Sequence, residues 1–171
     1  LGRFGEAHGV RLPSLRRVIS AGAPVPAHVL SRMRAMLPPD GAVVTPYGAT
    51  ECLPVATVES REVLEETAAM TAAGAGVCVG RPVPPARVSV IRITDAPIAR
   101  WSDATPVPPG TVGEIVVRGP QATRRYWGAE AQTALAKIPD DEGDGFHHRM
   151  GDLGYLDEAG RLWFCGRKSQ R

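Results

Sequence analysis

GAVVTPYGATE, residues 41–51, joins an apolar β-branched run to an aromatic ring, a hydroxyl and a carboxylate that follow within five positions. The apolar run predicts a short strand that ends in a turn at Gly48. Upstream, residues 14–22 (SLRRVISAG) predict a buried strand stopped by a glycine, and residues 27–37 carry apolar side chains at helical spacing. This order of strand, helix and strand predicts parallel strands joined by a crossover helix.

The second half of the chain has a different pattern. After a Gly-Ala-Gly turn at residues 74–76, short β-branched or aromatic runs bounded by Gly, Pro and Asp predict a small antiparallel sheet or barrel. We therefore expect an α/β protein, with part of a parallel α/β subdomain at residues 1–76 and a β-barrel-like subdomain at residues 77–171. Residues 134–148 are expected to form a loop or lid, exposed around residues 140–145.

Composition excludes several classes of protein. Among 171 residues, 20 basic and 18 acidic side chains give a net charge of +2, which is too even for a nucleic-acid-binding protein. Hydrophobic residues make up 43% of the chain, as in a folded domain, but no apolar run approaches the roughly 18–20 residues that span a bilayer. The three cysteines form no C-x-x-C pair, so we expect neither a disulfide framework nor a zinc site, and the cytoplasm is the expected location.

The end of the first stretch has side chains suited to a nucleotide. Tyr47 offers a flat face for a base, and Gly48 lets the backbone approach a ligand closely. Thr50 can donate a hydrogen bond to a phosphate oxygen, and Glu51 is a hard oxygen ligand suited to Mg²⁺. The alternative is a plain turn with a helix-capping threonine and an exposed glutamate, which spacing alone leaves open.

A second candidate stretch begins near residue 148. Asp152 lies between Gly151 and Gly154, where a carboxylate held on a tight turn can accept both hydroxyls of a ribose. Residues 155–164 then predict a β-hairpin, and Arg167 follows at its far end. A hairpin with a capping aspartate and a surface arginine would explain the same pattern.

Four other features of the sequence have residues typical of functional sites. The small-residue turn at residues 20–24 (SAGAP) could form the wall of an adenine slot or a simple strand-to-helix turn. The acidic run at residues 140–145 is no calcium loop, because the twelfth position, which needs a bidentate glutamate, is a glycine. His147 and His148 are adjacent, so on a strand they face opposite sides and cannot chelate one ion. Cys52 has no identifiable base, which argues against a nucleophile.

Taken together, the stretches resemble the signature motifs of the adenylate-forming superfamily, which includes acyl-CoA synthetases, peptide-synthetase adenylation domains and luciferases. The Y-G-x-T-E motif is present at residues 47–51, the G-D-x-G-Y motif at residues 151–155 and the G-R-K stretch at residues 166–168. The resemblance covers essentially the whole chain. It implies binding of ATP or AMP with Mg²⁺ held by Glu51, catalytic roles for Thr50 and Glu51, and nucleotide contacts from Gly22, Ala23, Pro24, Tyr47, Gly48, Ala49, Thr50, Asp152 and Arg167.

The resemblance also implies that the chain is part of a larger enzyme. In this family a Ser/Thr/Gly-rich phosphate loop precedes the Y-G-x-T-E motif, and a C-terminal domain with a catalytic lysine follows the hinge. We therefore expect residues 1–76 to be the C-terminal part of the nucleotide-binding subdomain and residues 77–171 to end at the hinge. Many members have an aspartate two residues after the hinge arginine, where this chain has Ser169, and this difference bears on the domain rotation.

Within the superfamily, residues 93–101, 148–158 and 161–171 are most similar to the β-lactone synthetases of bacterial long-chain olefin biosynthesis. The implied activity is adenylation of a β-hydroxy acid by ATP, then ring closure to a β-lactone with release of AMP. A fatty-acyl-CoA synthetase or fatty-acyl-AMP ligase is one alternative, and a non-catalytic nucleotide-binding module is another. The expected partners are ATP, an acyl carboxylate, the rest of the same enzyme and other enzymes of olefin biosynthesis.

Overall fold

The computed structural model describes residues 1–170. Its strands are β1 (Arg17–Ile19), β2 (Ala42–Ala49), β3 (Cys52–Glu59), β4 (Val77–Pro82), β5 (Arg87–Ile91), β6 (Gly113–Arg118), β7 (Lys137–Pro139), β8 (Phe146–Leu156) and β9 (Leu162–Arg167). Its helices are α1 (Gly2–Ala7), α2 (Ala27–Met36), α3 (Ser60–Glu62), α4 (Ala68–Ala72) and α5 (Glu130–Ala136). A π-helical turn, η1 (Val63–Thr67), joins α3 to α4, and two 3₁₀ turns are η2 (Trp101–Asp103) and η3 (Lys168–Gln170).

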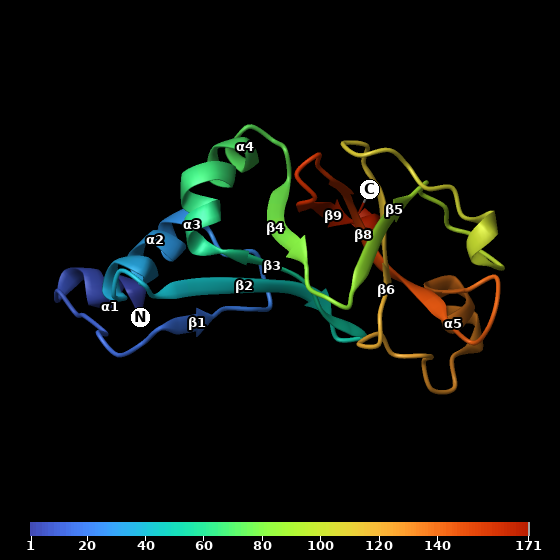
Figure 1. Cartoon of the computed structure of the whole chain (residues 1–171), viewed down its shortest axis with the longest axis horizontal. Helices are drawn as coiled ribbons and strands as arrows, with labels where there is room; N and C mark the ends of the chain where they lie inside the picture. The colour runs from blue at the N-terminus through green and yellow to red at the C-terminus, as the bar shows by residue number, and fades with distance from the viewer. Residues whose placement is uncertain (171) are drawn as a thin grey trace.

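One mixed sheet runs through the molecule. Its strand order is β1-β2-β3-β4-β9-β8-β6-β5, with β7 paired to β8 outside this path. Helices α1 to α4 gather at one end of the molecule, and β5, β6, β8 and α5 lie at the other (Figure 1). The α/β class is confirmed. Among the described residues, no helix combines the length and apolar character needed to cross a membrane.

The first half contains the predicted crossover. β1 and β2 are parallel, and α2 connects them. Leu30 and Leu37 pack with Val43 in a small core beneath the helix, as the apolar spacing predicted. The first strand is not buried as predicted, since the Ile19 side chain is 67% exposed. The physical reason is its place at the end of the strand order, where it pairs only with β2.

The predicted turn at Gly48 is wrong. β2 continues through Gly48 to Ala49, and the hairpin to β3 turns at Thr50 and Glu51. A Cβ on Gly48 would lie 2.6 Å from the carbonyl oxygen of Cys52. The glycine therefore serves close packing of the two strands, which the sequence pattern could not distinguish from a turn.

The second half is antiparallel, as predicted. Strands β4, β9, β8, β6 and β5 pair antiparallel in that order over a core that contains Ile115, Val117 and Leu162. Over the described residues the strand order does not return on itself, so the sheet is open and resembles a barrel only loosely. The expected loop at residues 134–148 instead contains the end of α5, β7 and the start of β8, with an exposed turn at residues 141–144.

The predicted subdomain boundary near residue 76 falls just before β4. This strand pairs with β3 on one side and with β9 on the other, so it links the two halves of the sheet. The division into two subdomains stays a prediction.

Candidate nucleotide-binding site

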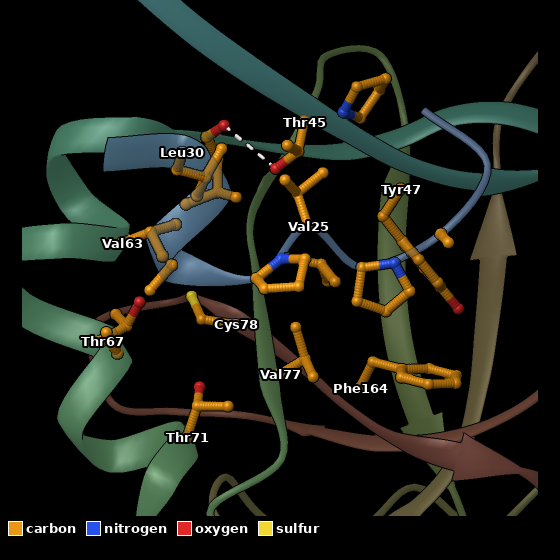
Figure 2. Close-up of a pocket in the computed structure, with 18 of the residues that line it drawn as sticks. Val25, Leu30, Thr45, Tyr47, Val63, Thr67, Thr71, Val77, Cys78 and Phe164 are labelled. Atoms are coloured by element: carbon orange, nitrogen blue, oxygen red, sulfur yellow. Dashed lines mark hydrogen bonds between the residues drawn. The ribbon is translucent and has the colours of Figure 1, made fainter. Parts of the chain in front are cut away.

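A cavity of about 390 Å³ lies where the two halves of the sheet meet. Figure 2 shows Val25, Tyr47, Val77 and Phe164 around this space, with Thr67 and Thr71 on the helical side. These residues come from the segment before α2, from β2, β4 and β9, and from η1 and α4. The cavity thus collects segments that are more than a hundred residues apart in the sequence.

The polar corner of the cavity is built on Asp152. The Tyr47 hydroxyl donates to Asp152 Oδ2 at 2.6 Å, and Arg167 Nη1 donates to Asp152 Oδ1 at 2.7 Å. The aspartate is 3% exposed, and its strand β8 pairs with β9 so that Asp152 and Arg167 are register partners. Tyr47, Asp152 and Arg167, which the sequence analysis identified from separate motifs, therefore lie together.

Asp152 does not lie on a tight turn as predicted. It is within β8, an eleven-residue strand, next to Gly151 with a positive φ of 68°. The register between β6 and β8 shifts near Asp152, so β8 contains a bulge here. The strand continues past Gly151 and Gly154. The bulge, and not the predicted turn, therefore directs the Asp152 carboxylate toward the cavity.

Tyr47 is held in its protonated, donating form. Burial, followed by the adjacent Asp152 carboxylate, raises the pKa of the Tyr47 hydroxyl. Its ring lies 6.2 Å from that of Phe164, centroid to centroid, at an angle of 46°. The pair presents two aromatic surfaces to the cavity, which suits a planar base.

Phe164 was missed by the sequence analysis. Strict alternation along β9 would place Phe164 and Arg167, three positions apart, on opposite faces. A one-residue register shift opposite Leu153 and Gly154 makes Cys165 the extra residue, so both side chains line the cavity. No signal in the sequence marks this bulge, although Gly166, with φ of 132°, follows it.

The remaining predicted nucleotide contacts divide between two cavities. Gly22, Ala23, Pro24 and Gly48 line the first cavity with Tyr47, Asp152 and Arg167. Ala49 and Glu51 line a second, neighbouring cavity of about 270 Å³, and Arg167 lines both. Thr50 is exposed at the hairpin turn and lines neither. Its contact with a phosphate stays a prediction.

The second cavity is lined by several charged side chains, including Glu114, Arg149 and Lys168. Glu114 is buried and accepts from Arg149 Nη2 at 2.7 Å and from Lys168 Nζ at 3.1 Å. Tyr126, His148 and Glu51 also line this cavity. Burial first, and then the Glu51 carboxylate, raise the pKa of the Tyr126 hydroxyl.

The donor set of this cavity fits a magnesium ion carried by a nucleotide. Within the described residues, no three His, Cys, Asp or Glu side chains are grouped to hold a metal by themselves. Mg²⁺ usually retains water and takes one or two carboxylates together with phosphate oxygens. Glu51, a single partly exposed carboxylate at the cavity, meets this need only when the nucleotide supplies the other ligands.

The two histidines have separate surroundings, as predicted. His147 stacks on Trp101 at 3.7 Å between centroids, and its Nε2 lies 3.0 Å from Asp140 Oδ1. His148 faces the second cavity instead. Cys52 is fully buried, and burial raises the pKa of its thiol, which agrees with a structural role.

The chain belongs to a family of nucleotide-binding enzymes. The profile of the family described as AMP-binding enzyme matches residues 2–127, which is most of the chain. The match includes the small-residue turn before α2, the β2–β3 hairpin and β4. The two cavities therefore lie in a protein whose relatives bind AMP.

More specific similarity comes from two curated proteins named olefin beta-lactone synthetase. The protein of Stenotrophomonas maltophilia (strain K279a) is 57% identical over 167 residues, and that of Xanthomonas campestris pv. campestris is 52% identical over 167 residues. Each match covers 96% of this chain and 30% of the relative, so the chain spans about a third of their length.

A solved structure shares the fold. O-succinylbenzoate coenzyme A synthetase from Bacillus subtilis, in complex with ATP and magnesium ion, is 26% identical with a TM-score of 0.68. The match covers 93% of this chain and 28% of that structure. It relates the described fold to an enzyme that binds ATP and a metal ion together.

Proposed function

We propose that this chain is the adenosine-binding segment of an AMP-forming β-lactone synthetase that acts on long-chain β-hydroxy acids. The observation that carries the proposal is the convergence of Tyr47, Asp152 and Arg167 on one cavity, together with the 57% identity to an olefin beta-lactone synthetase. Other enzymes of olefin biosynthesis are the expected partners, and the unpaired thiols agree with the cytoplasm as its location.

The cavity suits adenosine in one orientation. Tyr47 and Phe164 would bracket the base, while Gly22 and its small neighbours leave room along the opposite wall. Each Asp152 carboxylate oxygen already accepts one hydrogen bond, which fixes its position, and would accept a ribose hydroxyl with its remaining lone pair. Arg167, which is half exposed and lines both cavities, would then face the first phosphate.

The chemistry needs two anions to meet, a carboxylate and a triphosphate. The carboxylate oxygen attacks the α-phosphorus, the bond to the bridging oxygen breaks, and pyrophosphate leaves with the electron pair. Mg²⁺, held by Glu51 and the phosphate oxygens, would neutralise charge that develops in this step. Thr50 would hold the α-phosphate from the hairpin turn.

Ring closure follows on the same acyl chain. The β-hydroxyl oxygen attacks the activated carbonyl, its proton passes to a base or solvent, and AMP leaves as the acyl–oxygen bond to phosphate breaks. The product is a four-membered lactone. Exclusion of water favours this outcome, because a mixed anhydride hydrolyses readily.

The test uses the full-length protein with ATP, Mg²⁺ and a long-chain β-hydroxy acid. We expect pyrophosphate, AMP and a β-lactone in equal amounts, without coenzyme A, as measured by mass spectrometry. A simple fatty acid without the hydroxyl serves as the control, and should give pyrophosphate but no lactone. A protein that releases no pyrophosphate with either acid would contradict the proposal.

A second candidate function is an acyl-CoA synthetase or acyl-AMP ligase. The observation in its favour is the fold shared with O-succinylbenzoate coenzyme A synthetase. The same assay separates the two, since a strict requirement for coenzyme A and a thioester product would support this candidate. The higher identity to the two olefin beta-lactone synthetases favours the first proposal.

A further inference from the structure

Lys137 and His148 form a buried pair beside the second cavity. Lys137 Nζ lies 2.9 Å from His148 Nδ1, and the two residues are 6% and 2% exposed. They are register partners on β7 and β8, so the backbone fixes their approach. His148 lines the cavity that also contains Glu51 and Arg167, while Lys137 lies behind it.

Lys137 has the surroundings of a cation. Its ammonium lies 5.7 Å from the centroid of the Tyr126 ring and 5.3 Å from that of the Phe146 ring. It also reaches the Thr123 hydroxyl at 3.4 Å. Burial lowers the pKa of Lys137, whereas the nearby Cys52 and Glu51 raise it in opposition. The aromatic faces and the hydroxyl replace part of the lost hydration, so we take the ammonium as charged.

A charged Lys137 fixes the tautomer of His148. Burial, followed by the Lys137 charge, lowers the pKa of His148 to about 4, so the imidazole is neutral near pH 7. An ammonium has only donors, so Nδ1 must accept from it and the ring proton must be on Nε2. Nδ1 also lies 3.3 Å from the Ala136 carbonyl oxygen, but that longer contact would require the opposite tautomer.

The ring then presents a donor to the cavity. In the part of the chain that the structure describes, the hydrogen bonds of the His148 ring involve Nδ1 alone. Nε2–H is therefore available to a ligand that offers an oxygen. The second cavity adjoins the first through Arg167, which lines both, and this places it next to Asp152.

A phosphate group would suit the donors of the second cavity. A nucleotide whose ribose is bound at Asp152 has its phosphate chain beside Arg167, and so directed toward the second cavity. The lining of this cavity carries Arg149, Arg167 and Lys168 together with Glu51 and Glu114. Arg149 and Lys168 already donate to Glu114, whereas Arg167 uses Nη1 for Asp152 and is half exposed. Cations with donors and a neutral imidazole N–H suit phosphate oxygens better than an acyl chain.

We propose that His148 donates a hydrogen bond from Nε2 to an oxygen of the nucleotide's phosphate chain, and that Lys137 is the positioning residue that keeps the ring in this donating form. This inference rests on the proposed function, because it assumes that the first cavity binds adenosine. It assigns a phosphate contact to His148 on β8 and a positioning role to Lys137 on β7, and both residues lie outside the three motifs that indicated the site.

The test compares ATP with adenosine on the full-length protein by isothermal titration calorimetry without acyl substrate. We expect His148→Phe to weaken ATP binding by roughly ten- to a hundredfold, the effect of losing a hydrogen bond to a charged group, and to change adenosine binding less than twofold. His148→Gln, whose amide can donate from near the position of Nε2, should retain most of the ATP affinity. His147→Phe is the matched control on the adjacent position, and should leave ATP binding unchanged.

The role of Lys137 has its own test. Lys137→Met should weaken ATP binding but not adenosine binding, because the ring proton can then move to Nδ1, and Nε2 without its proton can no longer donate. The double variant Lys137→Met with His148→Gln should bind ATP more tightly than Lys137→Met alone, since glutamine needs no tautomer control. A merely structural role for Lys137 predicts no such recovery.

The outcomes separate this inference from the proposed function. If the parent binds neither adenosine nor ATP, the proposed function fails and the inference fails with it. If the parent binds both and His148→Phe matches it, or loses both ligands equally, only the inference is overturned. Should the phenylalanine variant not fold, His148→Asn replaces it, because its amide reaches only the position of Nδ1, and it should bind ATP more weakly than His148→Gln.

Discussion

Asp152 has the strongest single-residue role in the proposed site. Its carboxylate is buried and accepts from Tyr47 and Arg167. Asp152→Ala therefore removes the ribose acceptor and leaves the Tyr47 and Arg167 donors without a hydrogen-bond acceptor. We expect ATP affinity of the full-length protein to fall at least tenfold. Stability should fall by about 1–3 kcal/mol while the fold is kept. Calorimetric titration and circular dichroism measure the two effects.

The matched control for this change is Asp157→Ala. Asp157 directly follows β8 and is partly buried, and it accepts from Arg161 and from the Trp163 indole away from the cavity. It should lower stability by a similar amount and leave ATP affinity unchanged. An Asp152→Ala protein that binds ATP within about threefold of the parent argues against the ribose role.

His148 also gives a prediction about pH. Its pKa is about 4 in the folded protein and near 6.5 when unfolded, so the unfolded chain binds a proton first as pH falls. Stability is thus fully present above pH 6.5 and is lost as pH falls toward 4. Between pH 7.5 and 5.0 this group should contribute about 2 kcal/mol of destabilisation.

Urea unfolding of the full-length protein at these two pH values measures the effect. His148→Phe should show a smaller loss of stability at pH 5.0 than the parent, by about the same 2 kcal/mol. Burial lowers the pKa of His147 as well, so the His148→Phe variant retains a second acid-sensitive group and its loss of stability is reduced, not abolished. Equal pH dependence in the two proteins would contradict the burial of a neutral imidazole.

Single residues could be identified from the sequence where their chemistry marks them, and their roles stay predictions. Tyr47, Asp152 and Arg167 were identified from their motifs, and the structure brings them together. Phe164 was not identified, because its position depends on a bulge at Cys165 that changes which face of β9 it occupies. Such a bulge is set by pairing with another strand, which alternation within one strand cannot show.

At the scale of elements, the link between β3 and β4 depends on a glycine. Gly80 has φ of 85°, and a Cβ there would lie 1.8 Å from the carbonyl oxygen of Thr57 on β3. Gly80→Ala therefore adds a backbone clash to the cost of a left-handed conformation, and we expect a loss of about 3 kcal/mol or more. Thermal melting of the full-length protein measures it.

Gly110 is the matched control for this effect. It has φ of 77°, but nothing lies within 4 Å of the position of a Cβ. Gly110→Ala should cost only the conformational term, about 1–2 kcal/mol. Equal melting temperatures for the two variants would show that β3 and β4 separate freely at residue 80.

The elements themselves were only partly predictable. The β1–α2–β2 crossover and the β8–β9 hairpin follow from local patterns, and both are present. The β2–β3 hairpin was missed, because Gly48 was interpreted as a turn and β3 contains Pro54. Residues 134–139 were expected in a loop, yet they form the end of α5 and β7, whose pairing with β8 is non-local.

At the scale of the whole molecule, the nucleotide should join two distant parts of the chain. The first cavity is lined by residues 22–24 and 45–48 from one half and by Asp152, Phe164 and Arg167 from the other. We therefore expect AMP to protect both sets of segments from hydrogen exchange in the full-length protein, and to the same degree at each AMP concentration.

The segment at residues 96–112 is the internal control, because it lines neither cavity and should exchange at the same rate with and without AMP. Protection of residues 45–48 without protection of 150–154 and 164–167 would mean that AMP contacts one half of the sheet only. Parallel protection requires one ligand that touches both halves. That result would show that adenosine binds in the cavity shared by β2, β8 and β9, and that neither motif alone forms the binding site.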